Sequence, residues 1–227
     1  MCMAAESQQA RLERTAKIIA ILKKEFPEAQ SRLTYDRTNA LHSLVSTILS
    51  AQCTDDRVNI VTPGLFKKYP TVQAFAAVSQ EQLEEDVRTC GFYRNKAKNI
   101  RAAAAKILSD FGGKVPDTMD ELLSLPGVAR KTANCVLSNV YGKNEGVVVD
   151  THVIRLSGRM GLTKHTEPVK IEQDLMELVP QKQWGLFSHL MMFHGRKYCI
   201  ARKPKCADCP LGDSETPKKL CPSYNKV

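Results

Sequence analysis

The sequence predicts an all-α protein. Apolar residues recur at helical spacing along most of its 227 residues, and no segment shows the convincing alternation of apolar and polar residues that marks a strand. Proline or glycine follows most of the helical segments, as is usual at helix ends. With 43% hydrophobic residues, the chain is long enough to bury a core of its own, in one large domain or two smaller ones.

Two helices are expected in the N-terminal part of the chain. Residues 8–26 carry apolar side chains on one side, and Pro27 ends this helix. Residues 41–49 form the next helix, for which Thr38 or Asn39 supplies the cap. Because apolar residues dominate this second helix, it should be mostly buried.

A capping box marks a further helix in the middle of the chain. Ser79 and Gln82 form the box, and the helix is expected to end at Cys90, before Gly91. Phe92 then precedes an alanine-rich helix whose first turns are basic, with Arg94, Lys96, Lys98 and Arg101. Aromatic residues beside a basic run suit nucleic acid, but a hydrophobic contact that closes the preceding helix explains Phe92 equally well.

The segment LPGVARKTAN, residues 125–134, is expected to form a hairpin between two helices. Asp117 is the expected N-cap of the short first helix, which Pro126 stops. Gly127 supplies a backbone that can turn tightly or approach a ligand closely, and the second helix begins near Ala129.

Lys131 lies in the first turn of this second helix, on the side away from its apolar face. Exposed backbone N–H groups and the positive end of the helix dipole attract phosphate there and disfavour a protonated amine. That environment suits a lysine that works as a free amine. A solvated lysine on an amphipathic helix is an equally good interpretation of this stretch alone.

Asp150 follows three valines and precedes another helical stripe that continues to Gly161. Aspartate is a preferred N-cap residue, so a structural role explains the position, but a cap can also be a catalytic acid. Two later helices begin at Thr166-Glu167-Pro168 and at Trp184.

Four of the eight cysteines crowd the end of the chain with the spacing C-x6-C-x2-C-x11-C, at Cys199, Cys206, Cys209 and Cys221. In a reducing compartment, such a group is typical of a metal site rather than of two disulfides. Four thiolates suit a [4Fe-4S] cluster or zinc, and the spacing alone does not choose between them.

The charge balance favours a polyanionic partner, since 33 basic and 24 acidic residues give a formal net charge of +9. No apolar run approaches the roughly 20 residues of a membrane span. Residues 1–9 are polar and lack the apolar segment of a secretory signal, so we expect an intracellular protein.

Together, LPGVARKTAN, the VDTH sequence at residues 149–152 and the terminal cysteines resemble the endonuclease III family of base-excision DNA glycosylases. The hairpin alone also occurs in DNA-binding proteins without enzymatic activity, whereas the combination is far more specific. The resemblance covers most of the chain and implies a two-domain helix-hairpin-helix DNA glycosylase fold with a C-terminal [4Fe-4S] cluster loop. The implied domains are residues 33–144, and residues 1–32 plus 145–227, with the substrate groove between them.

By this resemblance, the protein is expected to remove oxidised pyrimidines from duplex DNA and to nick the abasic site by β-elimination. Lys131 would be the nucleophile, and Asp150 would assist proton transfer and stabilise positive charge on the sugar. The four terminal cysteines would hold the [4Fe-4S] cluster, although Cys221 lies six residues beyond the family's usual spacing and is the least secure ligand. The alternatives are a mismatch-specific glycosylase of the same superfamily and a non-catalytic helix-hairpin-helix DNA-binding protein.

The resemblance also assigns residues to the DNA. Gln52 would fill the space that an extruded base leaves, although a glutamine at a helix junction is usually only solvated. Phe92 occupies the position of an apolar wedge, where leucine is common in bacterial members. The other residues expected to face DNA are Gly127, Ala129, Arg130, His152, Arg202 and Lys205. The expected partner is duplex DNA with damaged bases or abasic sites, bound by a monomer in a bacterial cytoplasm at the nucleoid, or in a nucleus if the source is eukaryotic.

Overall fold

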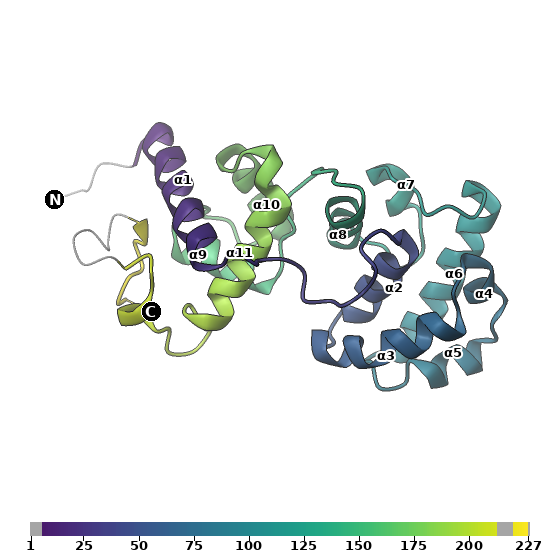
Figure 1. The fold of residues 1–227 in the computed structure, drawn as a ribbon. Helices are drawn as coiled ribbons and strands as arrows, with labels where there is room; N and C mark the ends of the chain where they lie inside the picture. Colours follow the sequence, from purple (N-terminus) through teal and green to yellow (C-terminus); the bar gives the residue numbers. More distant parts are fainter. Residues whose placement is uncertain (1–5, 213–219, 227) are drawn as a thin grey trace. The chain divides into compact units, whose positions relative to one another are not determined.

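The computed structural model describes residues 6–212 and 220–226. This part of the chain is helical and contains no strand, which confirms the predicted all-α class (Figure 1). None of its helices is both long and apolar enough to cross a membrane. The elements are α1 (Gln8–Glu25), α2 (Ala40–Ser50), α3 (Asp55–Lys68), α4 (Val72–Ala77), α5 (Gln80–Asp86), α6 (Tyr93–Phe111), α7 (Met119–Leu123), α8 (Arg130–Val140), α9 (Thr151–Arg159), α10 (Pro168–Leu178), the 3-10 helix η1 (Gln181–Gln183), α11 (Trp184–Lys197) and the 3-10 helix η2 (Cys206–Asp208).

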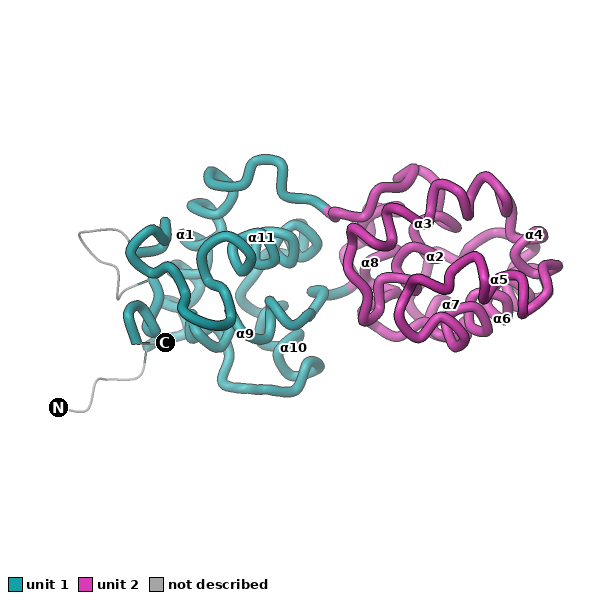
Figure 2. Tube along the Cα trace, turned by 90° about the horizontal axis from the view of Figure 1, so that it is seen from below, with its two compact units in different colours: residues 1–30, 146–227 teal, residues 31–145 magenta. Residues whose placement is uncertain are grey.

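The chain forms two compact units, shown in different colours in Figure 2. Unit 1 combines residues 1–30 with residues 146–227, so it is built from both ends of the chain. Unit 2 is the continuous segment of residues 31–145. Each unit has its own hydrophobic core.

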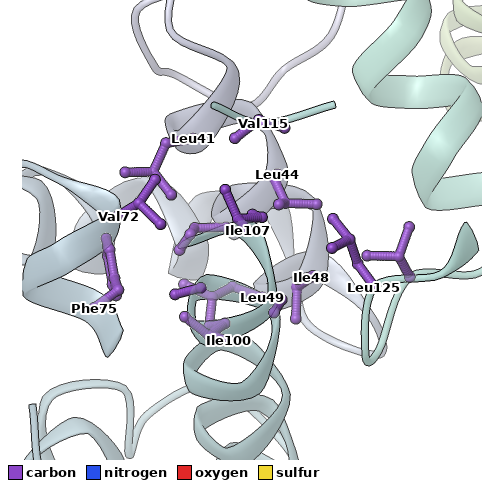
Figure 3. Packing of buried hydrophobic residues seen from close by; sticks show 14 of the residues in the cluster. Leu41, Leu44, Ile48, Leu49, Val72, Phe75, Ile100, Ile107, Val115 and Leu125 are labelled. Carbon is purple, nitrogen blue, oxygen red and sulfur yellow. The ribbon is translucent and has the colours of Figure 1, made fainter. Parts of the chain in front are cut away.

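The core of unit 2 is built around α2, which is buried from residue 43 to residue 49. This confirms the expectation that the helix is mostly buried. Helices α6 and α8 pack against it, and α4 packs against α6. Figure 3 shows Leu44 and Ile48 of α2 with Phe75 of α4 and Ile100 of α6 in one cluster. Each fully buried side chain of this size contributes roughly 1.5–3 kcal/mol, so this packing fixes the elements that carry the hairpin.

The core of unit 1 joins the first helix of the chain to helices from its C-terminal part. Helix α1 packs against α10 and α11, and α9 also packs against both. Leu22 of α1, Leu156 of α9, Leu175 of α10 and Phe187 of α11 are completely buried in this core. The buried face of α1 therefore has its partners at the far end of the sequence.

Three of the expected caps are present. The side chain of Asn39 accepts a hydrogen bond from the backbone N–H of His42 at 3.2 Å, and Ser79 accepts one from Gln82 at 3.1 Å. Asp150 caps α9, as described below. Such caps satisfy N–H groups that have no partner within the helix, and each contributes about 1 kcal/mol.

Two boundaries differ from the expectation, and one short helix, α4, was not expected. Asp117 does not cap α7, because the residue before this helix is Thr118. The carboxylate of Asp117 instead accepts a hydrogen bond from the amine of Lys143 at 2.6 Å, a contact that its sequence neighbours do not reveal. Helix α5 ends at Asp86, and the residues up to Cys90 form turns.

Candidate functional site

The hairpin between α7 and α8 is held by two buried residues and one glycine. Leu125 and Val128 are buried, and the N–H of Val128 donates to the carbonyl oxygen of Leu125 at 3.1 Å. Gly127 between them has a φ of +76°, in the left-handed region. A Cβ at this residue would also lie 2.6 Å from the Cβ of Asn99 on α6. Both the backbone angle and the close approach to α6 therefore require glycine.

The start of α8 combines exposed backbone with an exposed amine. Ala129 is its N-cap residue, so no side chain caps the first N–H groups there. Ala129, Arg130 and Lys131 are all exposed. Arg130 donates to the carbonyl oxygen of Glu145 at 3.4 Å. An uncapped helix start with adjacent cations is suited to bind a phosphate, and Lys131 is accessible to a substrate.

Gln52 and Phe92 are exposed at two neighbouring loops of unit 2. Their φ angles are +50° and +57°, an uncommon conformation for residues other than glycine. A Cβ at Gly91 would lie 3.1 Å from the carbonyl oxygen of Gln52, so the two loops lie side by side. Phe92 is 65% exposed, which argues against the interpretation that it only closes the preceding helix. The structure thus brings together the two residues expected to act on an extruded base.

The basic run at the start of α6 divides into two kinds of residue. Arg94 and Lys98 are exposed, as expected for a nucleic-acid contact. Lys96 is buried, and its amine donates to the carbonyl oxygen of Leu49 at 2.8 Å. Burial lowers the pKa of Lys96. The guanidinium of Arg101 donates to the carbonyl oxygen of Val78 at 2.7 Å.

Lys96 consequently holds the C-terminal end of α2, which leads directly into the Gln52 loop. In the sequence it stands in a basic run that suits nucleic acid, and the helical phase of α6 was the signal that could have separated it from its exposed neighbours. Asn99, against which the hairpin glycine packs, was also missed. Nothing local in its sequence marks that contact.

Asp150 is half-buried at the start of α9. Its Oδ1 accepts a hydrogen bond from the backbone N–H of Val153 at 2.8 Å, which confirms the N-cap interpretation. His152 is also half-buried, with its Nδ1 3.1 Å from the guanidinium of Arg155. Because arginine can only donate, Nδ1 is the acceptor in this pair. A Cβ at Gly195 would lie 2.6 Å from the same nitrogen, so glycine lets the imidazole lie against α11.

Two arginines of α9 bind the segment that contains the first terminal cysteine. Arg155 donates to the carbonyl oxygen of Cys199 at 3.1 Å. Arg159 donates to the carbonyl oxygens of Ile200 and Ala201 at 2.9 and 3.0 Å, and lies 3.3 Å from the sulfur of Cys199. These arginines were missed in the sequence, although their spacing of four residues puts them on one helix face. The helix that Asp150 caps therefore also fixes the cysteine segment.

The four terminal cysteines line one pocket of unit 1. The sulfur of Cys209 lies 3.7 Å from Nε2 of His194. Burial raises the pKa of the Cys209 thiol to about 11 and also raises the pKa of Cys221. A bound metal group reverses this preference, because a coordinating thiol is deprotonated.

The donor set suits a cluster. Four cysteines line one pocket, and thiolates are the ligands that hold an iron-sulfur cluster. Most of the insertion before Cys221, residues 213–219, lies outside the described residues. Arg202 and Lys205 are both exposed, and Lys205 lines the pocket.

Comparisons with known proteins agree with both the hairpin region and the cysteine segment. A family model described as "HhH-GPD superfamily base excision DNA repair protein" matches residues 45–181, and the model "Iron-sulfur binding domain of endonuclease III" matches residues 199–214. The chain is 52% identical over 214 residues to endonuclease III of Synechocystis sp., with 94% of each chain covered. It is 45% identical over 187 residues to endonuclease III of Bacillus subtilis, with 82% of this chain and 84% of the relative covered.

Solved structures are similar over nearly the whole chain. A trapped endonuclease III–DNA covalent intermediate is 40% identical, with a TM-score of 0.86 and coverage of 95% of this chain and 97% of the other. A thermostable thymine-DNA glycosylase, at 23% identity and a TM-score of 0.78, shares the fold over 98% of this chain and 100% of the other.

Proposed function

The chain belongs to the endonuclease III family of HhH-GPD base excision DNA repair proteins, and from that premise we propose which of its residues carry out the reaction. It is a bifunctional DNA glycosylase and AP lyase, it acts on DNA, and it carries a [4Fe-4S] cluster. What remains to be assigned is the role of each side chain, the damaged base and the assembly.

We propose that Lys131 is the nucleophile. Its neutral amine attacks C1′ of the extruded nucleotide, the bond from C1′ to the base breaks, and the base leaves. The bound nitrogen then opens the C1′–O4′ bond, O4′ takes up a proton and a protonated Schiff base forms. This Schiff base acidifies the C2′ proton, and loss of that proton expels the 3′ phosphate. The observation that carries this assignment is the exposure of Lys131 in the first turn of α8. The first N–H groups of this helix have no side-chain cap, so they suit the phosphates next to the extruded nucleotide.

Asp150 is proposed as the group that assists this amine. Its carboxylate transfers protons during the reaction and stabilises the positive charge that develops on the sugar. The hydrogen bond from the N–H of Val153 supports the role, because it fixes the orientation of the carboxylate before substrate binds.

The DNA is proposed to contact the exposed ends of helices. Gln52 fills the space left by the extruded base and Phe92 is the wedge, a pairing supported by their exposure and by the contact between their loops. The remaining residues proposed to contact the duplex are Gly127, Ala129, Arg130, His152, Arg202 and Lys205.

Cys199, Cys206, Cys209 and Cys221 are proposed as the ligands of the cluster, which when bound joins their segments into one rigid unit. We further propose oxidised pyrimidines as the substrate, a monomer as the active form and, because relatives such as that of Bacillus subtilis are bacterial, the bacterial cytoplasm as the location. The domains are proposed as residues 33–144, and residues 1–32 plus 145–227. The division into the two compact units supports these domains.

Borohydride trapping on duplex DNA with an abasic site tests the assignment of Lys131. Lys131→Gln removes the amine but keeps a polar side chain of similar length, so binding should persist while excision, nicking and trapping disappear. Arg130→Gln is the matched control, since it removes a neighbouring positive charge, and it should weaken binding yet still give a trapped adduct at saturating protein. A borohydride-stable adduct that forms in Lys131→Gln at the wild-type rate would place the nucleophile elsewhere.

A panel of duplexes with defined lesions tests the proposed substrate. Oxidised pyrimidines should be excised faster than mismatched thymine or adenine. The reverse order would favour the mismatch-specific alternative.

A further inference from the structure

Arg14 of α1 connects the first helix of the chain to the segment that carries the last cysteine. Its side chain is buried, and it donates to the carbonyl oxygens of Met160 at 2.6 Å, Leu220 at 3.1 Å and Gly161 at 3.2 Å. Glu6 accepts two further hydrogen bonds from the same guanidinium, at 2.7 and 2.8 Å. The five contacts hold the guanidinium in one orientation.

These contacts surround Cys221. Leu220, which Arg14 binds, is the residue before it. Pro222, the residue after it, packs against Gly161, where a Cβ would lie 3.3 Å from the proline ring. The sulfur of Cys221 itself lies 3.7 Å from the carbonyl oxygen of Arg159. Cys221 and Pro222 therefore contact the end of α9 and the turn after it, and Arg14 binds that turn and the cysteine segment at once.

The sequence explains why this ligand needs such support. Eleven residues separate Cys209 from Cys221. The match to the iron-sulfur domain of endonuclease III ends at residue 214, before Cys221 is reached. A longer connection is cheap in chain entropy, but it leaves the position of its last residue less determined by the first. Tertiary contacts must then place Cys221.

Arginine suits this position better than another cation. Its planar guanidinium presents five N–H donors in a fixed geometry, so it can bind several carbonyl oxygens and a carboxylate together. A lysine ammonium carries three N–H donors on one atom, so it cannot reach carbonyl oxygens and a carboxylate on several sides as the broad guanidinium does. The positive charge of Arg14 also stabilises the negative charge that a thiolate at Cys221 carries when it binds iron.

We propose that Arg14 is a positioning residue for the [4Fe-4S] cluster. By binding the carbonyl group of Leu220, Arg14 holds Cys221 in place as the fourth ligand. The first helix of the chain is thus part of the cluster site. This role rests on Cys221 as a proposed ligand of the cluster, and not on the roles proposed for Lys131 and Asp150.

The test measures the cluster itself rather than the activity. Wild type and Arg14→Gln are purified without oxygen, and cluster content is determined from visible absorbance and from iron per protein. The rate of cluster loss is then followed after addition of excess EDTA. Since a buried hydrogen bond from a charged group contributes about 1.5–3 kcal/mol, Arg14→Gln should lose its cluster at least roughly ten times faster than wild type. Arg14→Lys, which keeps the charge, should be intermediate.

Leu22→Ala is the matched control, because Leu22 is completely buried on the same helix and lies eight residues after Arg14. It should lower the midpoint of denaturant unfolding, yet lose its cluster more slowly than Arg14→Gln. If Arg14→Gln retains the cluster as wild type does, or if Leu22→Ala loses it as fast, the proposal is wrong. If Arg14→Gln does not accumulate, Arg14→Lys is compared with Leu22→Ala instead. The proposal then requires that Arg14→Lys lose its cluster faster than Leu22→Ala.

Discussion

Replacing Gly127 with alanine should damage the hairpin for two separable reasons. The φ of +76° places the residue in the left-handed region, which costs an alanine about 1–2 kcal/mol. The added Cβ would also lie 2.6 Å from the Cβ of Asn99, an atom that cannot rotate away because the backbone of α6 fixes it. Overpacking of this kind costs about 1–3 kcal/mol, so the total loss of unfolding free energy should be about 2–5 kcal/mol.

Gly142→Ala separates the two costs. Gly142 has a similar φ of +64°, but a Cβ there would meet nothing within 4 Å. This control should therefore lose only about 1–2 kcal/mol. Denaturant unfolding gives both free energies, and binding to a duplex with an abasic-site analogue shows whether the hairpin has moved. Gly127→Ala should bind at least roughly tenfold more weakly than Gly142→Ala, which corresponds to about 1.4 kcal/mol.

A double variant tests the contact directly. Asn99→Gly removes all three side-chain atoms that the new Cβ would meet. In that background, Gly127→Ala should cost only as much as Gly142→Ala does, because the backbone angle remains and the clash is gone. If Gly127→Ala and Gly142→Ala destabilise the protein equally in the wild-type background, the close approach to α6 does not constrain the hairpin.

Three further predictions concern the proposed chemistry and the DNA contacts. Asp150→Asn should slow turnover by on the order of 10²-fold with little loss of stability, because asparagine is an equally good N-cap and can accept the same hydrogen bond. Gln52→Ala and Phe92→Ala should impair excision of a damaged base from duplex DNA more than cleavage of a preformed abasic site, since only the first reaction requires extrusion of a base. Affinity should fall with salt by about 0.9 log units per phosphate contact for each decade, and Arg94→Gln and Lys98→Gln should each reduce that slope.

Each of these has an outcome that contradicts it. Wild-type turnover in Asp150→Asn would leave the carboxylate as a cap alone, and Asp150→Ala would then show only the loss of about 1 kcal/mol that a missing cap causes. Equal losses on both substrates in Gln52→Ala and Phe92→Ala would indicate a general binding defect. A binding constant that does not change with salt would rule out phosphate contacts as the main source of affinity.

Local signals in the sequence predicted much of the fold. Asp150 and Ser79 are caps whose hydrogen-bond partners lie three residues away, so residues close in the sequence determine both caps. The all-α class follows from helical spacing that extends over whole segments. The hairpin at Pro126 and Gly127 is equally local, because a proline that stops a helix and a glycine that turns the backbone act through their own dihedral angles.

What the sequence could not show depends on contacts between distant residues. Lys96 belongs to a basic run that suits nucleic acid, but its amine donates to the end of α2. Asp117 has the sequence context of a cap, yet it pairs with Lys143, 26 residues away. Arg14 and Leu220 are separated by 206 positions. No periodicity or motif encodes such pairs, since they exist only once the helices have packed.

The division of unit 1 between the two ends of the chain has a consequence for how the protein is made. On the ribosome, Arg14 is synthesised 206 residues before Leu220, which at about 5–20 residues per second is an interval of roughly 10–40 s. Unit 2 is continuous and can fold within that interval, whereas α1 must wait with its apolar face uncovered until the C-terminal helices have emerged. The nascent chain is therefore most open to aggregation or chaperone binding at its own first helix.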